Sequence, residues 1–191
     1  MFGCRSDSFD DSGGHMRLAL GILTLLSVVS VSAQEQPLSL QQGTLRDWTM
    51  LKDTMMKISA AMPEDKFGFK PTPPQRNFGE QVLHVVEANV NQIGRLGAKT
   101  PSPAYNMKET RKAEILKMLE ASFDYGTTVL QSMSDNDLLA SAVSGRGDRF
   151  MGGSNRVRVV NYVMGHTWDI YGQMVVYLRL NGITPPASQR P

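Results

Sequence analysis

Cysteine is all but absent from this sequence of 191 residues, in which Cys4 is the one thiol. A lone cysteine excludes a disulfide within the chain, a zinc site made of cysteines and an iron–sulfur cluster, all of which need several thiolates. Neither sign of charge is in marked excess, because 20 Lys and Arg stand against 18 Asp and Glu and leave a net charge of +2. So slight an excess gives no reason to expect nucleic-acid binding, and we expect no nucleic-acid partner.

Long hydrophobic runs are lacking as well, apart from one at residues 18–31. Met16-Arg17 precedes this run, and Val31-Ser32-Ala33 closes it. The order of a short basic segment, an apolar segment and small residues is typical of a secretory signal peptide. As a helix the run would span about 21 Å at ~1.5 Å per residue, which is less than the roughly 30 Å of a bilayer core. The sequence therefore predicts a cleaved leader and no stable membrane anchor.

The predicted leader covers residues 1–33, with its true start at Met16, and the exported chain covers residues 34–191. We expect the exported chain to be periplasmic or secreted. It contains no cysteine, and a composition of 41% hydrophobic and 20% charged residues excludes a disordered chain. A domain of about 150 residues buries roughly 70% of its unfolded surface without disulfides. We therefore predict a single domain.

Apolar residues recur at three- and four-residue spacing in four segments of the exported chain, which is the period of a helix with one buried face. The first segment has Trp48 and Leu51 on one face, with Thr44 as the expected N-cap. Asn77 and Glu80 form a capping box at the start of the second segment. We predict helices over residues 45–61, 78–96, 107–133 and 156–181.

The connections between these helices differ in character. Asn106 and Glu109 match the capping-box pattern again, before the third helix. Residues 63–77 are rich in proline and residues 134–154 are rich in glycine, so both are expected to be long connections, with a short helical turn at Leu138 in the second. No alternation typical of strands is present. The predicted fold class is all-α, a four-helix bundle with long crossover connections.

Histidine is scarce in the exported chain, which contains only His84 and His166. His84 shares the polar side of its helix with Glu80 and Glu87, and His166 lies at the edge of an apolar face near Asp169. Each has a plain interpretation, His84 as a solvent-facing residue and His166 as a hydrogen-bonded packing residue. The alternative is that both bind one metal ion, although a catalytic zinc normally has three protein ligands.

Three blocks of sequence resemble the DinB (damage-inducible) family. They are MPEDKFGFKPTP at residues 62–73, NFGEQVLH at residues 77–84 and GHTWDIYGQMVVYLRLNGITPP at residues 165–186. The resemblance extends over nearly all of the exported chain. It implies a four-helix bundle with a long crossover. It also implies a divalent-metal site of three histidines, one from the second helix and two, spaced four residues apart, from the fourth.

Carried over to this sequence, the resemblance places His84 and His166 at two ligand positions and Ile170 where the third histidine is expected. Isoleucine cannot coordinate a metal. The nearest carboxylates that can complete the set are Asp169, beside Ile170, and Glu87 on the second helix. We predict His84, His166 and Asp169 as ligands for zinc, nickel, iron or manganese. The alternative is a weakened or lost site.

Three functions remain open from the sequence. The first is an exported DinB-like protein with an incomplete divalent-metal site and an activity that the sequence does not name. The second is a metal-dependent transferase or hydrolase acting on a small molecule, of the thiol-dependent type implied by the resemblance, with its thiol supplied from outside. The third is a metal-free binding or structural module. A small-molecule substrate and a homodimer are the expected partners.

Overall fold

The computed structural model describes residues 36–143 and 151–189, and the predicted leader lies outside these ranges. Within them the chain forms five α-helices and two short 3₁₀ helices. These are α1 (Leu40–Ala61), η1 (Glu64–Lys66), α2 (Phe78–Gly94), α3 (Lys112–Gln131), α4 (Asp135–Leu139), α5 (Arg156–Leu180) and η2 (Pro186–Ser188). None of the described helices combines the length and the apolar character needed to cross a membrane.

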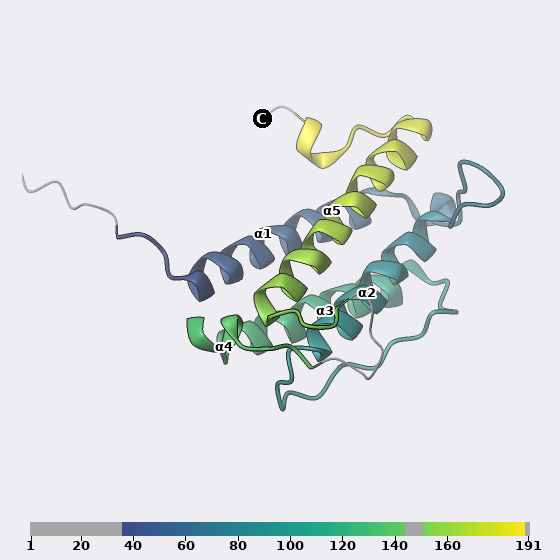
Figure 1. Cartoon of the computed structure of the whole chain (residues 1–191). Helices are drawn as coiled ribbons and strands as arrows, with labels where there is room; N and C mark the ends of the chain where they lie inside the picture. Colours follow the sequence, from purple (N-terminus) through teal and green to yellow (C-terminus); the bar gives the residue numbers. More distant parts are fainter. Residues whose placement is uncertain (1–35, 144–150, 190–191) are drawn as a thin grey trace, which may run out of the picture. The chain divides into compact units, whose positions relative to one another are not determined.

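The four long helices form a closed bundle (Figure 1). Helices α1 and α2 each pack against both α3 and α5, so that α1 lies diagonally opposite α2. Over the described ranges the only β pairing is one isolated bridge, between Ser141 and Asn155. The predicted all-α four-helix bundle is confirmed. The short helix α4 packs against α5 and the start of α1, and its Leu138 is fully buried, as the sequence suggested.

Helix α1 begins five residues earlier than the sequence predicted. Ser39 is its N-cap and forms a capping box with Gln42, whereas the predicted cap, Thr44, lies inside the helix and donates its hydroxyl proton to the Leu40 carbonyl. The carboxylate of Asp135 also accepts hydrogen bonds from the backbone N–H groups of Leu40 and Gln41. The first turn of α1 is therefore held twice, by the local capping box of Ser39 and Gln42, a pattern that the predicted start did not take into account, and by Asp135, which is distant in sequence.

Helix α2 begins where the sequence predicted. The Asn77 side chain accepts from the Glu80 N–H at 2.8 Å, and the Glu80 carboxylate accepts from the Asn77 N–H at 2.7 Å. The helix ends at Gly94, two residues before the predicted end, and Gly97 in the following turn has a φ of 73°, a value that residues with a Cβ rarely adopt. The start of α2 is thereby fixed, and this start determines where His84 lies.

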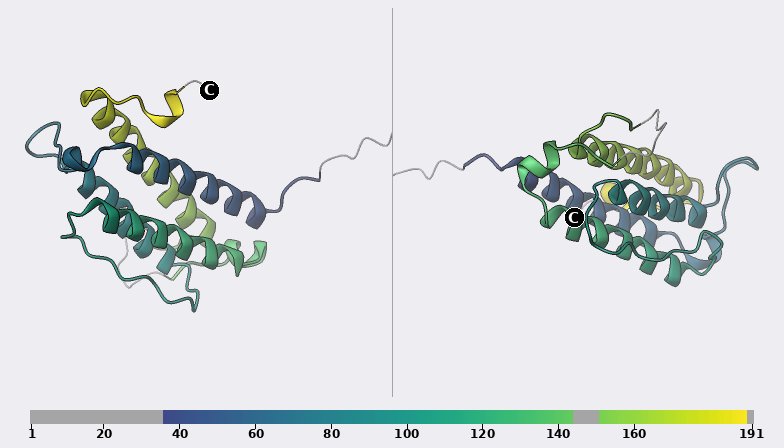
Figure 2. Two further views of the ribbon diagram at one scale, coloured as in Figure 1. Left: turned by 180° about the vertical axis from the view of Figure 1, so that it is seen from behind. Right: turned by 60° about the horizontal axis from the view of Figure 1, so that its bottom comes forward.

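The long crossover of the bundle is the connection between α2 and α3, residues 95–111. Figures 1 and 2 show it returning along the outside of the bundle, so that α2 and α3 run in the same direction. The sequence assigned its last residues to a helix starting at 107, and this was wrong. Glu109 does not cap the helix with Asn106. It pairs with Arg111 at 2.8 Å, and this pairing lowers the pKa of its carboxyl group to about 2.

Candidate metal centre

Two histidines from neighbouring helices face each other in the bundle. His84 on α2 and His166 on α5 have their Nε2 atoms 3.1 Å apart, and their ring centroids are separated by 4.9 Å with the ring planes at 87°. The His84 side chain is 21% exposed, so it is half-buried against α5 and does not face solvent freely. The structure thus brings together the two imidazoles that the sequence singled out.

The wide burial of α2 explains why His84 meets α5. Helix α2 packs against both α3 and α5, and its buried residues cover more than one face, with Leu83 and Val85 on either side of His84. The sequence pattern suggested a single apolar stripe, which left His84 on the polar side. On α5, His166 lies beside the buried Thr167 and two turns before the buried Met174. Both histidines therefore line the boundary between α2 and α5.

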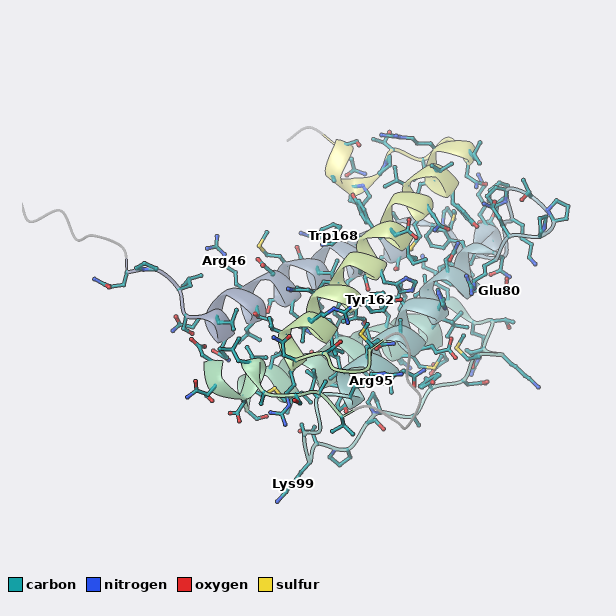
Figure 3. The ribbon with its side chains drawn as sticks, in the orientation of Figure 1. Arg46, Glu80, Arg95, Lys99, Tyr162 and Trp168 are labelled. Carbon is teal, nitrogen blue, oxygen red and sulfur yellow. The ribbon has the colours of Figure 1, made fainter. Side chains whose placement is uncertain are left out.

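One side chain lies beside the outer side of each ring. Tyr162, one turn before His166, stacks on its ring with centroids 6.2 Å apart and planes at 10° (Figure 3 labels Tyr162). Glu87, one turn after His84, has its Oε2 atom 3.7 Å from the Nδ1 atom of His84. That Nδ1 atom is buried and has no hydrogen-bond partner among the described residues. A small movement of Glu87 would allow it to accept the Nδ1 proton, which leaves Nε2 free as a ligand.

A row of polar side chains continues from the histidines along the α2–α5 boundary. Gln81 donates to Gln173 at 2.8 Å, Gln173 donates to Asp169 at 3.0 Å, and Tyr177 donates to the Arg76 carbonyl at 2.7 Å. Sequence reasoning missed Gln81, which is only 2% exposed. Its position three residues before His84 is the signal that would have placed it on the same side of the helix.

No third ligand lies beside the two histidines in the described structure. Ile170 is 2% exposed and belongs to the hydrophobic core, where it packs as an ordinary core residue. Asp169 lies at the surface of α5 with its Oδ2 atom accepting from Gln173. In the described parts of the chain no three His, Cys, Asp or Glu side chains gather closely enough to hold a metal ion. The role of Asp169 as third ligand therefore stays a prediction.

Both imidazoles are in surroundings that favour the neutral form. Burial is the main cause that lowers the pKa of His84, with the charge of Arg76 and the neighbouring His166 acting in the same direction and Glu87 opposing them. Burial also lowers the pKa of His166, and the negative charge of Asp169 opposes that shift. A neutral imidazole carries the lone pair that a metal needs. Each neutral ring can therefore offer one nitrogen lone pair at neutral pH.

We expect the metal-free protein to lose stability as the pH falls below about 6.5, the usual pKa of histidine. The folded-state pKa values of His84 and His166 are lowered. The unfolded chain therefore takes up protons first, and the free energy of unfolding falls until the pH passes the folded-state values. Thermal unfolding between pH 8 and 5 measures this. In a variant with both histidines changed to Gln, the unfolding temperature should depend less on pH. An equal dependence in the variant and the unaltered chain would contradict the lowered pKa values of the two histidines.

The distances between the two rings fit one metal ion bound to both. With bonds of ~2.0–2.1 Å, two imidazole nitrogens on one ion lie roughly 3.3 Å apart at a tetrahedral angle and roughly 2.9 Å apart at a right angle. The observed 3.1 Å lies between these values. Two rings pointing at one ion at an angle of about 100° have centroids about 4.8 Å apart, close to the observed 4.9 Å. A straight N–H···N bond would place them near 5.4 Å.

Known proteins share the fold described above. The sequence profile of the DinB family matches residues 38–191. A DinB-like protein from Bacillus cereus has a TM-score of 0.66 at 20% identity, covering 75% of this chain and 94% of that one. A DinB-like protein from Bacillus subtilis has a TM-score of 0.59 at 13% identity, covering 78% of this chain and 99% of that one. No curated protein matches the chain.

Proposed function

The chain belongs to the DinB family, and on this premise we propose that His84 and His166 bind one divalent metal ion through their Nε2 atoms. The observation that carries the proposal is the 3.1 Å separation of these two atoms across the α2–α5 boundary. Zinc, nickel, iron and manganese are the candidate metals, since imidazole and carboxylate ligands suit all four.

Asp169 is the third ligand in this proposal. It lies three residues after His166, and its negative charge is close enough to raise the pKa of that histidine, against the larger effect of burial. In the described structure its Oδ2 atom is held by Gln173, at 3.0 Å, and Gln173 is held in turn by Gln81. Rotation of Asp169 about its side-chain bonds, with release of Gln173, brings the carboxylate toward His166. The resulting set of two histidines and one carboxylate matches known catalytic metal sites.

The activity that such a site supports best is a metal-dependent transfer or hydrolysis reaction on a small molecule. The bound metal supplies Lewis-acid chemistry to that molecule. The protein's own residues fix the site. Tyr162 stacks against the ring of His166, Glu87 at 3.7 Å can move to accept a hydrogen bond from the Nδ1–H of His84, and the buried core around Ile170 keeps water from one side. A thiol used in such a reaction comes from outside, because residues 34–191 contain no cysteine.

Retention of metal by residues 34–191, which contain every described helix, tests this proposal. The chain is prepared without a histidine tag, exposed to each metal, dialysed and analysed for metal per chain by mass spectrometry. We expect near-stoichiometric metal in the unaltered chain and a loss of affinity of at least roughly tenfold in His84→Gln, His166→Gln and Asp169→Asn, as removal of ligands or their partners costs in other sites.

The matched control is Asp53→Asn, which removes an exposed carboxylate on α1 that pairs with Lys57. Its metal content should equal that of the unaltered chain. Equal metal content in the two histidine variants and the unaltered chain would overturn the proposed site. Loss of metal in the histidine variants but not in Asp169→Asn would restrict the site to the two histidines.

A metal-free role has one observation in its favour. The 3.1 Å separation is also that of a hydrogen bond between one protonated and one unprotonated Nε2 atom. Under this alternative the pair ties α2 to α5, and the protein is a binding or structural module. Failure of every metal to remain bound in the experiment above would favour it.

We further propose that the protein is exported and that its leader is removed before Gln34, as the order of residues 16–33 indicates. Expression of the full chain in a bacterial host should give an exported protein whose N-terminal sequence starts at Gln34. Recovery of the protein only from the cytoplasm, with residues 16–33 still attached, would contradict export.

A further inference from the structure

Two glycines in the middle of α5, Gly165 and Gly172, lie where the structure leaves room for a side chain. Glycine weakens a helix interior relative to alanine, so a glycine there is explained when a side chain would not fit. At Gly79 a Cβ atom would lie 3.0 Å from the ring of Phe67. At Gly165 and Gly172, by contrast, no heavy atom of the described structure lies within 4 Å of such an atom, outside the neighbouring helical backbone. Contacts within the chain therefore do not require these two glycines.

The residues around the two glycines form one exposed face of α5. Gly165, Gly172 and Arg179 are spaced by seven residues, and Trp168 and Val176 lie four residues before and after Gly172. At 3.6 residues per turn, all five lie within about 40° of the direction of Gly172. Trp168 is 45% exposed and Val176 is 51% exposed, although both are large and apolar. We refer to these five residues as the Gly172 face.

A hollow of about 380 Å³ lies next to this face, between α1 and α5. It is lined by Asp47 and Met50 of α1 and by Gly165 and Trp168 of α5, among others. Figure 3 shows Trp168 on the side of α5 near α1. Within the described residues neither Asp47 nor Arg179 forms an ion pair. The hollow at one end of the face thus contains an acid without an ion pair, Asp47, and the other end of the face carries a base without one, Arg179.

We propose that the Gly172 face binds a second copy of this chain, with the two α5 helices antiparallel and a two-fold axis passing at Gly172. A two-fold axis places each residue opposite the one equally far on the other side of Gly172. Trp168 then lies against Val176 of the second copy, and Arg179 lies opposite Gly165. Because Gly165 has no side chain, the guanidinium can enter the hollow beside it and reach Asp47.

This arrangement satisfies both unpaired charges twice, once at each end of the interface, and covers both exposed apolar side chains. The glycine at the axis allows the two helix backbones to approach closely, as small residues do where helices cross. The face and the hollow beside it together carry the exposed tryptophan and both charged groups, Arg179 and Asp47, which is the self-complementarity that a two-fold interface requires. A second copy is therefore the occupant that fits.

Sedimentation equilibrium of residues 34–191 over a range of concentrations tests the proposal. We expect the unaltered chain to have twice the monomer mass and Gly172→Gln to weaken the dimer at least roughly tenfold, about 1.4 kcal/mol. The unfolding temperature of Gly172→Gln, measured at a concentration where both chains are monomeric, should be unchanged or raised, because the added side chain meets nothing in the monomer. Gly43→Gln, at an equally open helical glycine on α1, is the control and should leave the mass unchanged.

A charge exchange tests the register. Arg179→Asp and Asp47→Arg should each weaken the dimer, and the double variant should restore it. An unaltered chain that is monomeric at every concentration, or a dimer that Gly172→Gln leaves intact, would overturn the proposal. Disruption by Gly172→Gln without rescue in the double variant would overturn the antiparallel register. None of these results depends on the metal site.

Discussion

Ile170→His should raise the affinity for zinc roughly ten- to a hundredfold, about 1.4 to 2.8 kcal/mol. Position 170 lies one turn after His166, on the same side of α5. A histidine there supplies the third ligand that a catalytic zinc normally has. Competition with a chromogenic chelator measures the affinity in the variant and in the unaltered chain.

The same substitution should destabilise the metal-free protein. Ile170 is 2% exposed within the core, so the change removes buried apolar surface and places a polar ring among apolar neighbours. We expect a loss of about 2–4 kcal/mol in the free energy of unfolding without metal and its partial recovery with zinc. Ile170→Gln is the matched control, with the same polar burial and no imidazole. Equal zinc affinities in the His and Gln variants would show that the third position no longer points into a site.

Gly126→Ala should destabilise the bundle by about 3 kcal/mol, which for a domain of this size lowers the unfolding temperature by roughly 6–12 °C. A Cβ atom at Gly126 of α3 would overlap the ring of Trp48 on α1. That ring cannot move away easily. It is fully buried, its Nε1–H donates to the Phe123 carbonyl at 3.0 Å, and it packs on the Phe123 ring with centroids 5.0 Å apart.

Gly94→Ala provides the control for this prediction. Gly94 is also helical, but the nearest atom to its added Cβ is the Tyr125 hydroxyl oxygen at 3.9 Å, an ordinary contact. Its variant should be neutral or more stable by up to about 1 kcal/mol, because alanine favours a helix over glycine. Calorimetry of the two variants separates the clash from the helix preference. Equal unfolding temperatures would mean that α1 and α3 adjust freely at this contact.

The sequence predicted the helices well where local chemistry determines them. The capping box of Asn77 and Glu80 placed the start of α2 correctly, and α5 was predicted to within one residue of its end at Leu180. The predicted start of α1 at residue 45 was wrong by five residues. The start of α1 at Leu40 was missed although Ser39 and Gln42 match the capping-box pattern, and the additional hold of Asp135 on this turn comes from a residue distant in sequence.

The two histidines of the candidate site could be picked out from the sequence, whereas their approach in space could not. His84 and His166 were identified because they are the only histidines after the leader and match two positions of the resemblance. Their 3.1 Å approach depends on the packing of α2 against α5. The period of apolar residues indicates one buried face for a helix, but α2 is buried on more than one. The link from Gln81 through Gln173 to Asp169 likewise appears only once the helices are packed.

Anomalous diffraction from crystals of the zinc-loaded protein, recorded on both sides of the zinc absorption edge, tests the central claim most directly. The account predicts one strong anomalous peak between α2 and α5, at ~2.0–2.1 Å from the Nε2 atoms of His84 and His166, with the Asp169 carboxylate turned toward it. Absence of a peak at this place in crystals that contain zinc, with the two histidines still hydrogen-bonded to each other, would contradict it.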